Sequence, residues 1–284
     1  MAAMLTEKIT ILSRQKSLAY CKNHEIYFSP AKLPLITYGC PLGLSLSASC
    51  QKTASVIVQE LGNLMASTTD NSRSSPNQSL KCELLVEIVT TGWLNFYLDA
   101  KLIARWLERS PVNIQLLLSN YQQGIKQDIA AGTESLASSS LFFPQYIHAR
   151  CCSLLRLGAR EKLIRLSFNA GATTWQIEQP SLISWLDEQN NLLLTQTSEL
   201  DLLEQLLRLS DSWPENHPEH YWSKLALNFS RAIAIFLAEC RFLGEVRQKY
   251  PSKAIARLRL IALVRFWLEK ILQAKLNLAA PQAM

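Results

Sequence analysis

Residues 81–98 read KCELLVEIVTTGWLNFYL, and this stretch decides the fold of the N-terminal part of the chain. It is rich in Val, Ile, Thr and aromatic residues and alternates apolar and polar side chains in places, a pattern that favours β-strands. The pair Thr91-Gly92 lies between its two halves and is typical of a turn. Helical spacing over 48–64 and 101–108 predicts a helix on either side. We therefore expect a small α+β module.

Two polar stretches, ASTTDNSRSSPNQS at 66–79 and AGTESLASSS at 131–140, have the composition of a loop and a linker. Beyond residue 140 the pattern is helical, with almost no strand signal, and Ser198-Glu-Leu-Asp201 has the form of a capping box. Residues 226–243 are apolar on nearly every face, which predicts the central helix of a bundle. The predicted fold class is α+β, with an α+β domain over 1–110, a linker over 111–140 and an all-α bundle over 141–284. The expected helices cover 144–168, 180–190, 198–211, 220–243 and 251–278.

Composition excludes several classes of protein. Of the 284 residues, 48% are hydrophobic and 18% are charged, which is too apolar for a disordered chain. The sequence has no run of about 18 uncharged apolar residues, and its first residues do not resemble a secretory signal. We expect a cytoplasmic protein without membrane insertion. The seven cysteines are odd in number and form no C-x-x-C motif, which predicts reduced core thiols.

Basic residues are concentrated late in the chain. The 29 basic and 23 acidic residues leave a net charge of +6, yet 241–275 alone has nine basic and two acidic residues. This basic block, which includes Arg257 and Arg259, is either a solvated helix face or a surface that binds phosphates.

Helical spacing also places Phe143, Tyr146 and Arg150 on one stripe. Such a stripe could stack on an unpaired base and hold its phosphate, or could belong to the core. His217 and His220 form the one close histidine pair, and a surface turn explains them better than a metal site. The sequence contains no nucleotide-binding or hydrolase motif, so we expect no catalytic residues, metal or cofactor.

Residues 143–156, FPQYIHARCCSLLR, resemble the segment that opens the anticodon-binding (DALR) domain of arginyl-tRNA synthetases. Residues 225–246 resemble the long helix of that domain, and 256–264 resemble its Ala-Arg-Leu run. Residues 280–284, APQAM, are similar to the family's closing Ala-Pro-Glu-Arg-Met. Residues 87–98, EIVTTGWLNFYL, resemble a Gly-Phe-Ile-Asn-Phe-x-Leu signature of the family's additional N-terminal domain, which contacts the tRNA elbow.

The departures from the family concern catalysis. About thirty residues stand where the family has its catalytic domain, and the sequence has neither the His-x-Gly-His nor the Lys-Met-Ser-Lys-Ser signature. Ile147 replaces a family alanine at a place where RNA would approach, and Ala283 replaces an arginine.

The resemblance implies a non-catalytic relative that binds tRNA or a tRNA-like RNA. A protein-interaction scaffold and a tRNA-binding subunit of a split enzyme remain open. The implied RNA-binding residues are Phe143, Gln145, Tyr146, His148, Arg150, Arg156, Arg257, Arg259, Met284, Trp93, Asn95 and Phe96.

Overall fold

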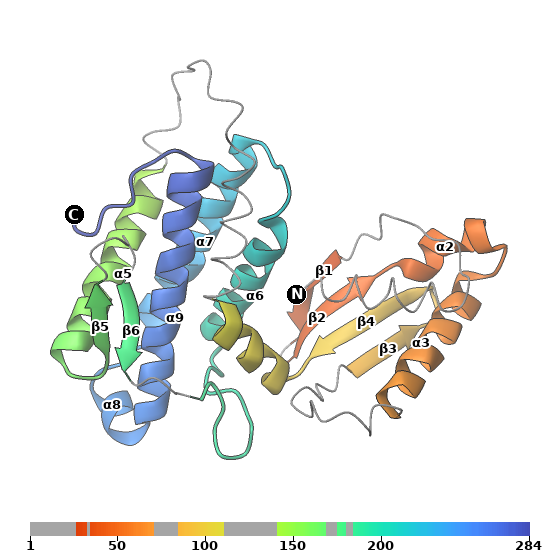
Figure 1. Cartoon of the computed structure of the whole chain (residues 1–284), viewed down its shortest axis with the longest axis horizontal. Helices are drawn as coiled ribbons and strands as arrows, with labels where there is room; N and C mark the ends of the chain where they lie inside the picture. The colour runs from red at the N-terminus through yellow and green to blue at the C-terminus, as the bar shows by residue number, and fades with distance from the viewer. Residues whose placement is uncertain (1–26, 33–34, 71–84, 111–140, 169–174, 180–183) are drawn as a thin grey trace. The chain divides into compact units, whose positions relative to one another are not determined.

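The computed structural model describes residues 27–32, 35–70, 85–110, 141–168, 175–179 and 184–284 (Figure 1). The chain divides into two compact units, Met1–Trp106 and Leu107–Met284. The first has an antiparallel sheet with helices, and the second is mainly helical, so the fold is α+β as predicted. The predicted boundaries at 110 and 140 stay a prediction, because 111–140 lies outside the described residues. No helix in the described ranges is long and apolar enough to cross a membrane.

The sheet of the first unit has the strand order β1-β2-β4-β3, with every neighbouring pair antiparallel. The predicted hairpin is confirmed, because Gly92 forms the turn between β3 and β4 with φ of +95°. The predicted helix over 48–64 is instead two helices that are separated by residues 51–53. The elements are β1 (Tyr27–Lys32), β2 (Leu35–Cys40), α2 (Leu42–Cys50), α3 (Ala54–Asp70), β3 (Leu85–Val89), β4 (Trp93–Leu98) and a helix over 100–110.

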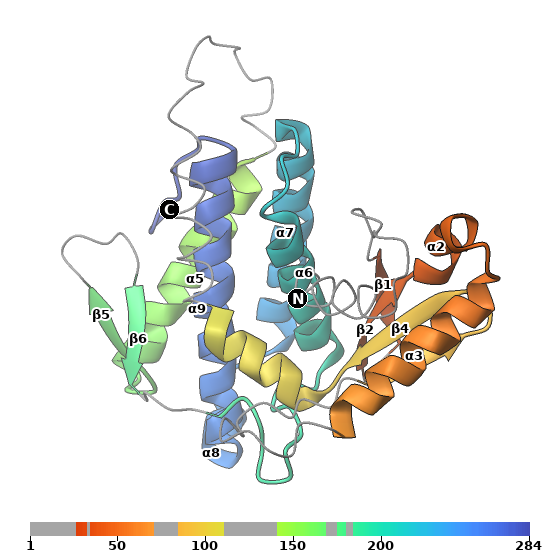
Figure 2. The same ribbon diagram turned by 45° about the vertical axis from the view of Figure 1, so that its right-hand side comes forward.

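One face of this sheet is the hydrophobic core of the first unit. On β4, Leu94, Phe96 and Leu98 are buried and alternate with partly exposed residues. Helices α2 and α3 pack against β3 and β4 on this face (Figures 1 and 2). At Gly62 of α3, an added Cβ would lie 2.2 Å from Ile88, so the glycine allows the helix to approach the sheet closely.

The second unit is a helical bundle that also carries a β-hairpin. Its elements are α5 (Phe142–Arg160), β5 (Arg165–Phe168), β6 (Trp175–Gln179), α6 (Thr197–Ser212), α7 (Glu219–Glu239), α8 (Glu245–Lys249), α9 (Pro251–Lys270) and a π-helical turn, η2 (Ile271–Lys275). The prediction of an all-α domain is therefore corrected, because β5 and β6 pair antiparallel. The described residues 184–190 are not helical either, and Leu186 forms a β-bridge with Leu192.

Helix α5 ends earlier than predicted, at Arg160, because the chain turns there. Lys162 has φ of +57°, and its N–H donates to the carbonyl of Ala159 while that of Leu163 donates to Gly158. This is the Schellman arrangement that terminates helices, usually with glycine at the left-handed position. Lys162 occupies that position here, so the sequence carries no glycine signal for the end of the helix.

The most buried helix is α9 rather than the predicted 226–243. Residues all around α9 are buried, including Arg257 and Arg265, whereas Ile235 of α7 is 54% exposed. In Figure 1, α9 lies alongside α5, and it also contacts α7. The sequence did not predict the burial of α9, because a helix with several arginines is expected to be exposed rather than central.

Candidate nucleic-acid interface

The exposed face of α5 combines aromatic and basic side chains. Phe142, Tyr146 and Arg150 follow at intervals of four residues, and Arg156 and Arg160 continue the exposed face toward the end of the helix. The 19 residues of α5 include no Asp or Glu. Arg150 Nη1 lies 3.4 Å from the hydroxyl oxygen of Tyr146 and donates to it, so the cation stands beside the ring. This face offers stacking surfaces next to charges that bind phosphate.

The predicted stripe is displaced by one residue at its start. Phe142 is 57% exposed, whereas Phe143 is partly buried. The spacing of Phe142, Tyr146 and Arg150 would have indicated this from the sequence, because residues four apart share a face of a helix. Ile147 is only 2% exposed and belongs to the core, so its bulk does not obstruct this face.

Three predicted site residues of α5 contact the chain itself. Gln145 Nε2 donates to the carbonyl of Ala279 at 2.9 Å, and Arg156 Nη2 donates to that of Gln282 at 2.8 Å. Between them, His148 Nδ1 lies 2.8 Å from the carbonyl oxygen of Pro281. We call residues 276–284 the 276–284 segment. These contacts show that it runs along α5 in the same direction as the helix. Met284 is the end of this segment in the sequence and is exposed.

His148 is buried, and groups from three elements surround it. Besides the Pro281 carbonyl, Cys152 Sγ lies 4.0 Å from His148 Nδ1, on the same helix. Arg265 and Glu269 act on it from α9, where they form an ion pair at 3.1 Å. Burial lowers the pKa of His148, because a charged imidazole would lose its hydration. A neutral ring with its proton on Nδ1 donates to the Pro281 carbonyl.

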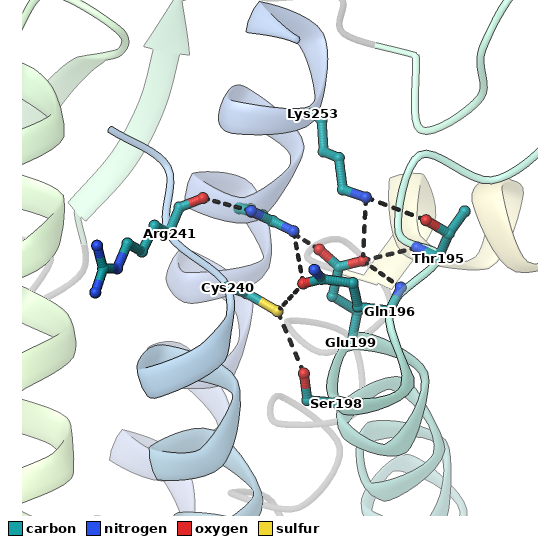
Figure 3. A network of polar contacts seen from close by, with 8 residues as sticks. Thr195, Gln196, Ser198, Glu199, Cys240, Arg241 and Lys253 are labelled. Atoms are coloured by element: carbon teal, nitrogen blue, oxygen red, sulfur yellow. Dashed lines mark hydrogen bonds and ion pairs between the residues drawn. The ribbon is translucent and has the colours of Figure 1, made fainter. Parts of the chain in front are cut away.

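The basic block has buried and exposed members: Arg257 and Arg265 are buried, whereas Arg241, Arg247 and Lys249 are exposed. The Arg257 guanidinium contacts three partners, Glu199, Gln196 and Arg241, which Figure 3 labels. Its Nε donates to Glu199 Oε1 at 2.6 Å, its Nη2 donates to Gln196 Oε1 at 2.8 Å, and its Nη1 donates to the carbonyl of Arg241. Both Arg257 and Glu199 are buried. Arg257 therefore does not reach a ligand at the surface.

Glu199 also begins helix α6, as a correction to the predicted capping box. The helix starts at Thr197, so Gln196 precedes it and Glu199 is its third residue. Glu199 Oε2 accepts from the backbone N–H groups of Thr195 and Gln196 at 2.7 and 2.8 Å. Lys253 Nζ lies 3.9 Å from the same oxygen (Figure 3). The carboxylate thus joins the start of α6 to α9.

Other members of the basic block also have internal partners. Arg259 lies over the ring of Trp185, and burial lowers its pKa. Arg247 Nη1 forms an ion pair with Glu161 at 2.7 Å. Lys275 lies within 4.7 Å of the ring centroids of Trp213 and Trp222, which form part of the core. The block is therefore divided between internal contacts and exposed cations, whereas the three arginines of α5 are all exposed.

In the first unit, the three predicted elbow residues lie on different faces of the sheet. Phe96 is fully buried, so it supports the fold and offers no surface to RNA. Trp93 and Asn95 alternate with the buried residues of β4 and lie on the opposite face. Asn95 Nδ2 donates to Glu87 Oε2 at 3.1 Å, and Tyr97 donates to the same carboxylate, which raises the pKa of Tyr97. An acidic group therefore stands beside Asn95.

The described residues offer no group of three or more His, Cys, Asp or Glu that could hold a metal. His217 stacks on Tyr221 and pairs with Glu215 at 2.7 Å. Cys21 and Cys82 lie outside the described residues. The other five cysteines, Cys40, Cys50, Cys151, Cys152 and Cys240, are free thiols, as predicted.

Among known proteins, the chain is similar to the arginine–tRNA ligase of Synechococcus sp. (strain JA-3-3Ab), with 28% identity over 181 residues. The matched part is 64% of this chain and 27% of that protein, so the chain spans about a quarter of the relative's length. No protein-family model matches the chain, and no solved structure matches it significantly. The similarity supports a distant relationship with arginyl-tRNA synthetases.

Proposed function

We propose that this protein is a non-catalytic relative of arginyl-tRNA synthetases that binds tRNA, or an RNA with a tRNA-like loop, on the exposed face of α5. The observation that carries the proposal is the combination of Phe142, Tyr146 and Arg150 on one face of a helix without acidic residues. The likeness to the anticodon-binding domain, and the similarity to an arginine–tRNA ligase, support RNA as the ligand.

The chemistry of this face favours unpaired nucleotides over a duplex. An aromatic ring stacks on a base only when the base is free of its own neighbours, as in a loop. Arg150 stands next to Tyr146, so a stacked base would bring its phosphate within reach of the guanidinium. Arg160 lies about 15 Å further along the helix, from the rise per residue. It extends the contact along the strand.

Binding of a hairpin RNA with an unpaired loop tests this function directly. A tRNA(Arg) anticodon stem-loop is the probe, and a paired duplex of the same composition is its control. Tyr146→Ala should weaken binding of the hairpin by about 5- to 150-fold, because stacking on an aromatic ring contributes about 1–3 kcal/mol per base. Tyr250→Ala is the matched control, since Tyr250 is an exposed tyrosine outside α5, between α8 and α9. Equal losses in the two variants would refute the site.

Salt dependence gives an independent measure of the phosphate contacts. If Arg150 and Arg160 of α5 each neutralise one phosphate, log K should fall with log salt at a slope of about −1.4 for a single strand. Arg150→Ala should reduce that slope by about 0.7, whereas Arg241→Ala, an exposed arginine of the basic block, should leave it unchanged. A slope near zero for the wild type would refute phosphate binding on this face.

Two further measurements separate this proposal from its rivals. Arginine-dependent ATP–pyrophosphate exchange should be absent for the protein alone and in the presence of tRNA. Exchange that appears with a second polypeptide would identify a split enzyme instead. Capture of a stoichiometric protein partner, together with no binding of the hairpin, would favour a protein-interaction scaffold.

A further inference from the structure

Three of the side chains that the sequence assigns to RNA binding use their hydrogen-bonding atoms on the main chain of the 276–284 segment. Gln145, His148 and Arg156 contact the carbonyl oxygens of Ala279, Pro281 and Gln282 at 2.8–2.9 Å. At about 100° per residue, Gln145 and Arg156 lie about 40–60° around α5 from Phe142 and Arg160, which stand at the edge of the exposed face that Tyr146 and Arg150 continue. The segment therefore runs beside the exposed face proposed for RNA.

We propose that Gln145, His148 and Arg156 are positioning residues, which hold the 276–284 segment against α5 so that its exposed side completes the RNA site. The proposal rests on the function proposed above. It reassigns these three residues from contacting RNA to building the surface that RNA contacts. Tyr146, Arg150 and the exposed end of the segment, with Met284, are then the groups that meet the ligand.

In the described structure, few other hydrogen bonds hold the segment, so its position depends mainly on the three side chains of α5. Leu276 is buried, and the N–H of Leu278 donates to the carbonyl of Leu272 at 2.7 Å, so the start of the segment is fixed to the bundle. From Ala279 onward, the hydrogen bonds that hold the segment in the described part of the chain come from α5. Loss of one such bond should loosen this part of the segment by about two- to tenfold.

His148 lies between the other two attachments. Its ring is buried against Arg265, Glu269 and Cys152, and burial lowers its pKa, so the neutral imidazole is favoured. The Pro281 carbonyl acts on the pKa in the opposite direction, because it accepts from a charged imidazole as well.

Amide relaxation in the full-length protein without RNA measures the position of the segment directly. In the wild type at about pH 7.5, the amides of residues 279, 280, 282 and 283 should have order parameters near 0.85, as in a rigid backbone. Gln145→Ala and Arg156→Ala should lower them toward 0.6 or below, the range of flexible chain. The same variants should weaken hairpin binding, because the segment no longer completes the site. Arg150→Ala is the control, and it should weaken hairpin binding without changing the relaxation.

His148→Asn separates a positioning role from a simply structural one. The asparagine Nδ2 can donate to the Pro281 carbonyl in place of imidazole Nδ1. His148→Asn should therefore keep both segment order and hairpin affinity. His148→Leu should lose both, and if it does not fold, Gln145→Ala supplies the same test.

The possible failures are distinguishable. If Gln145→Ala and Arg156→Ala weaken hairpin binding while the segment stays rigid, these residues contact RNA and the positioning role is refuted. If His148→Asn loses segment order as fully as His148→Leu, the hydrogen bond to Pro281 does not hold the segment and the role of His148 is refuted. If the wild type binds no hairpin at any pH, the proposed function fails, and the relaxation data still decide what holds the segment.

Discussion

Replacement of Arg257 by Met should strongly destabilise the second unit. In the wild type, the guanidinium donates to Glu199 at 2.6 Å and to Gln196 at 2.8 Å, and both ionic side chains are almost fully buried. Methionine fills a similar volume but leaves the Glu199 carboxylate without its closest cation. Lys253, at 3.9 Å, is the remaining basic group near that carboxylate in the described network.

The expected loss is about 3–5 kcal/mol, which is typical when one partner of a buried ion pair is removed. For a unit of this size, 1 kcal/mol corresponds to about 2–4 °C in Tm, so Tm should fall by about 6–20 °C. The double variant Glu199→Gln/Arg257→Met should recover part of the loss. The neutral amide leaves no unpaired charge, and its oxygen still accepts from the backbone N–H groups of Thr195 and Gln196.

Urea unfolding of the full chain, followed by tryptophan fluorescence, measures these differences. The clustered Trp213, Trp222 and Trp267 report on the second unit, where the network lies. Arg247→Met is the matched control, because Arg247 also pairs with a carboxylate but is 42% exposed. It should cost less than about 1 kcal/mol, as surface ion pairs do. If Arg257→Met and Arg247→Met have the same effect, burial does not set the value of the pair, and our reasoning is wrong.

Two predictions concern the first unit. Gly92→Ala should destabilise it by more than about 1 kcal/mol, because alanine disfavours positive φ and its Cβ would lie 2.6 Å from the Cβ of Ala54. Gly244→Ala, with positive φ but open space around it, should cost less in the same urea assay, and equal costs would refute a steric contribution at Gly92. Burial raises the pKa of Cys40 to about 11, so only about one thiol in a thousand is ionised at pH 8. Alkylation of Cys40 in the folded protein, followed by mass spectrometry, should therefore be slow at pH 8 and accelerate up to tenfold per pH unit, and rapid modification at neutral pH would contradict the burial.

Local patterns predicted local structure well. The β3–β4 hairpin was predictable because its strand composition and its Gly92 turn are adjacent in sequence. The end of α5 was not, because Lys162 takes a conformation that usually indicates glycine. The hairpin of β5 and β6 was also missed, since each strand is too short to outweigh the helical spacing around it.

Sequence patterns did not predict which residues the charged side chains pair with. Arg257 and Glu199 are 58 residues apart, and only the folded bundle brings them together. The sequence therefore located the cations of the basic block but not their surroundings. The α5 site was more predictable, because Tyr146 and Arg150 lie one turn apart on the same helix. Its second part, the 276–284 segment, depends on contacts across more than 120 residues.

Burial explains why α9, which has more basic residues than α5, is not the better candidate surface. An arginine cannot lose its charge at physiological pH, so a buried one must be paired inside the protein. In α9, Arg257 and Arg265 are paired with Glu199 and Glu269, and the pairing cancels the field that would attract a phosphate. The arginines of α5 lie at the surface of a helix that has no carboxylate of its own. Net charge counted along the sequence therefore identifies the wrong helix, and exposure of each cation is the quantity that locates a binding surface for RNA.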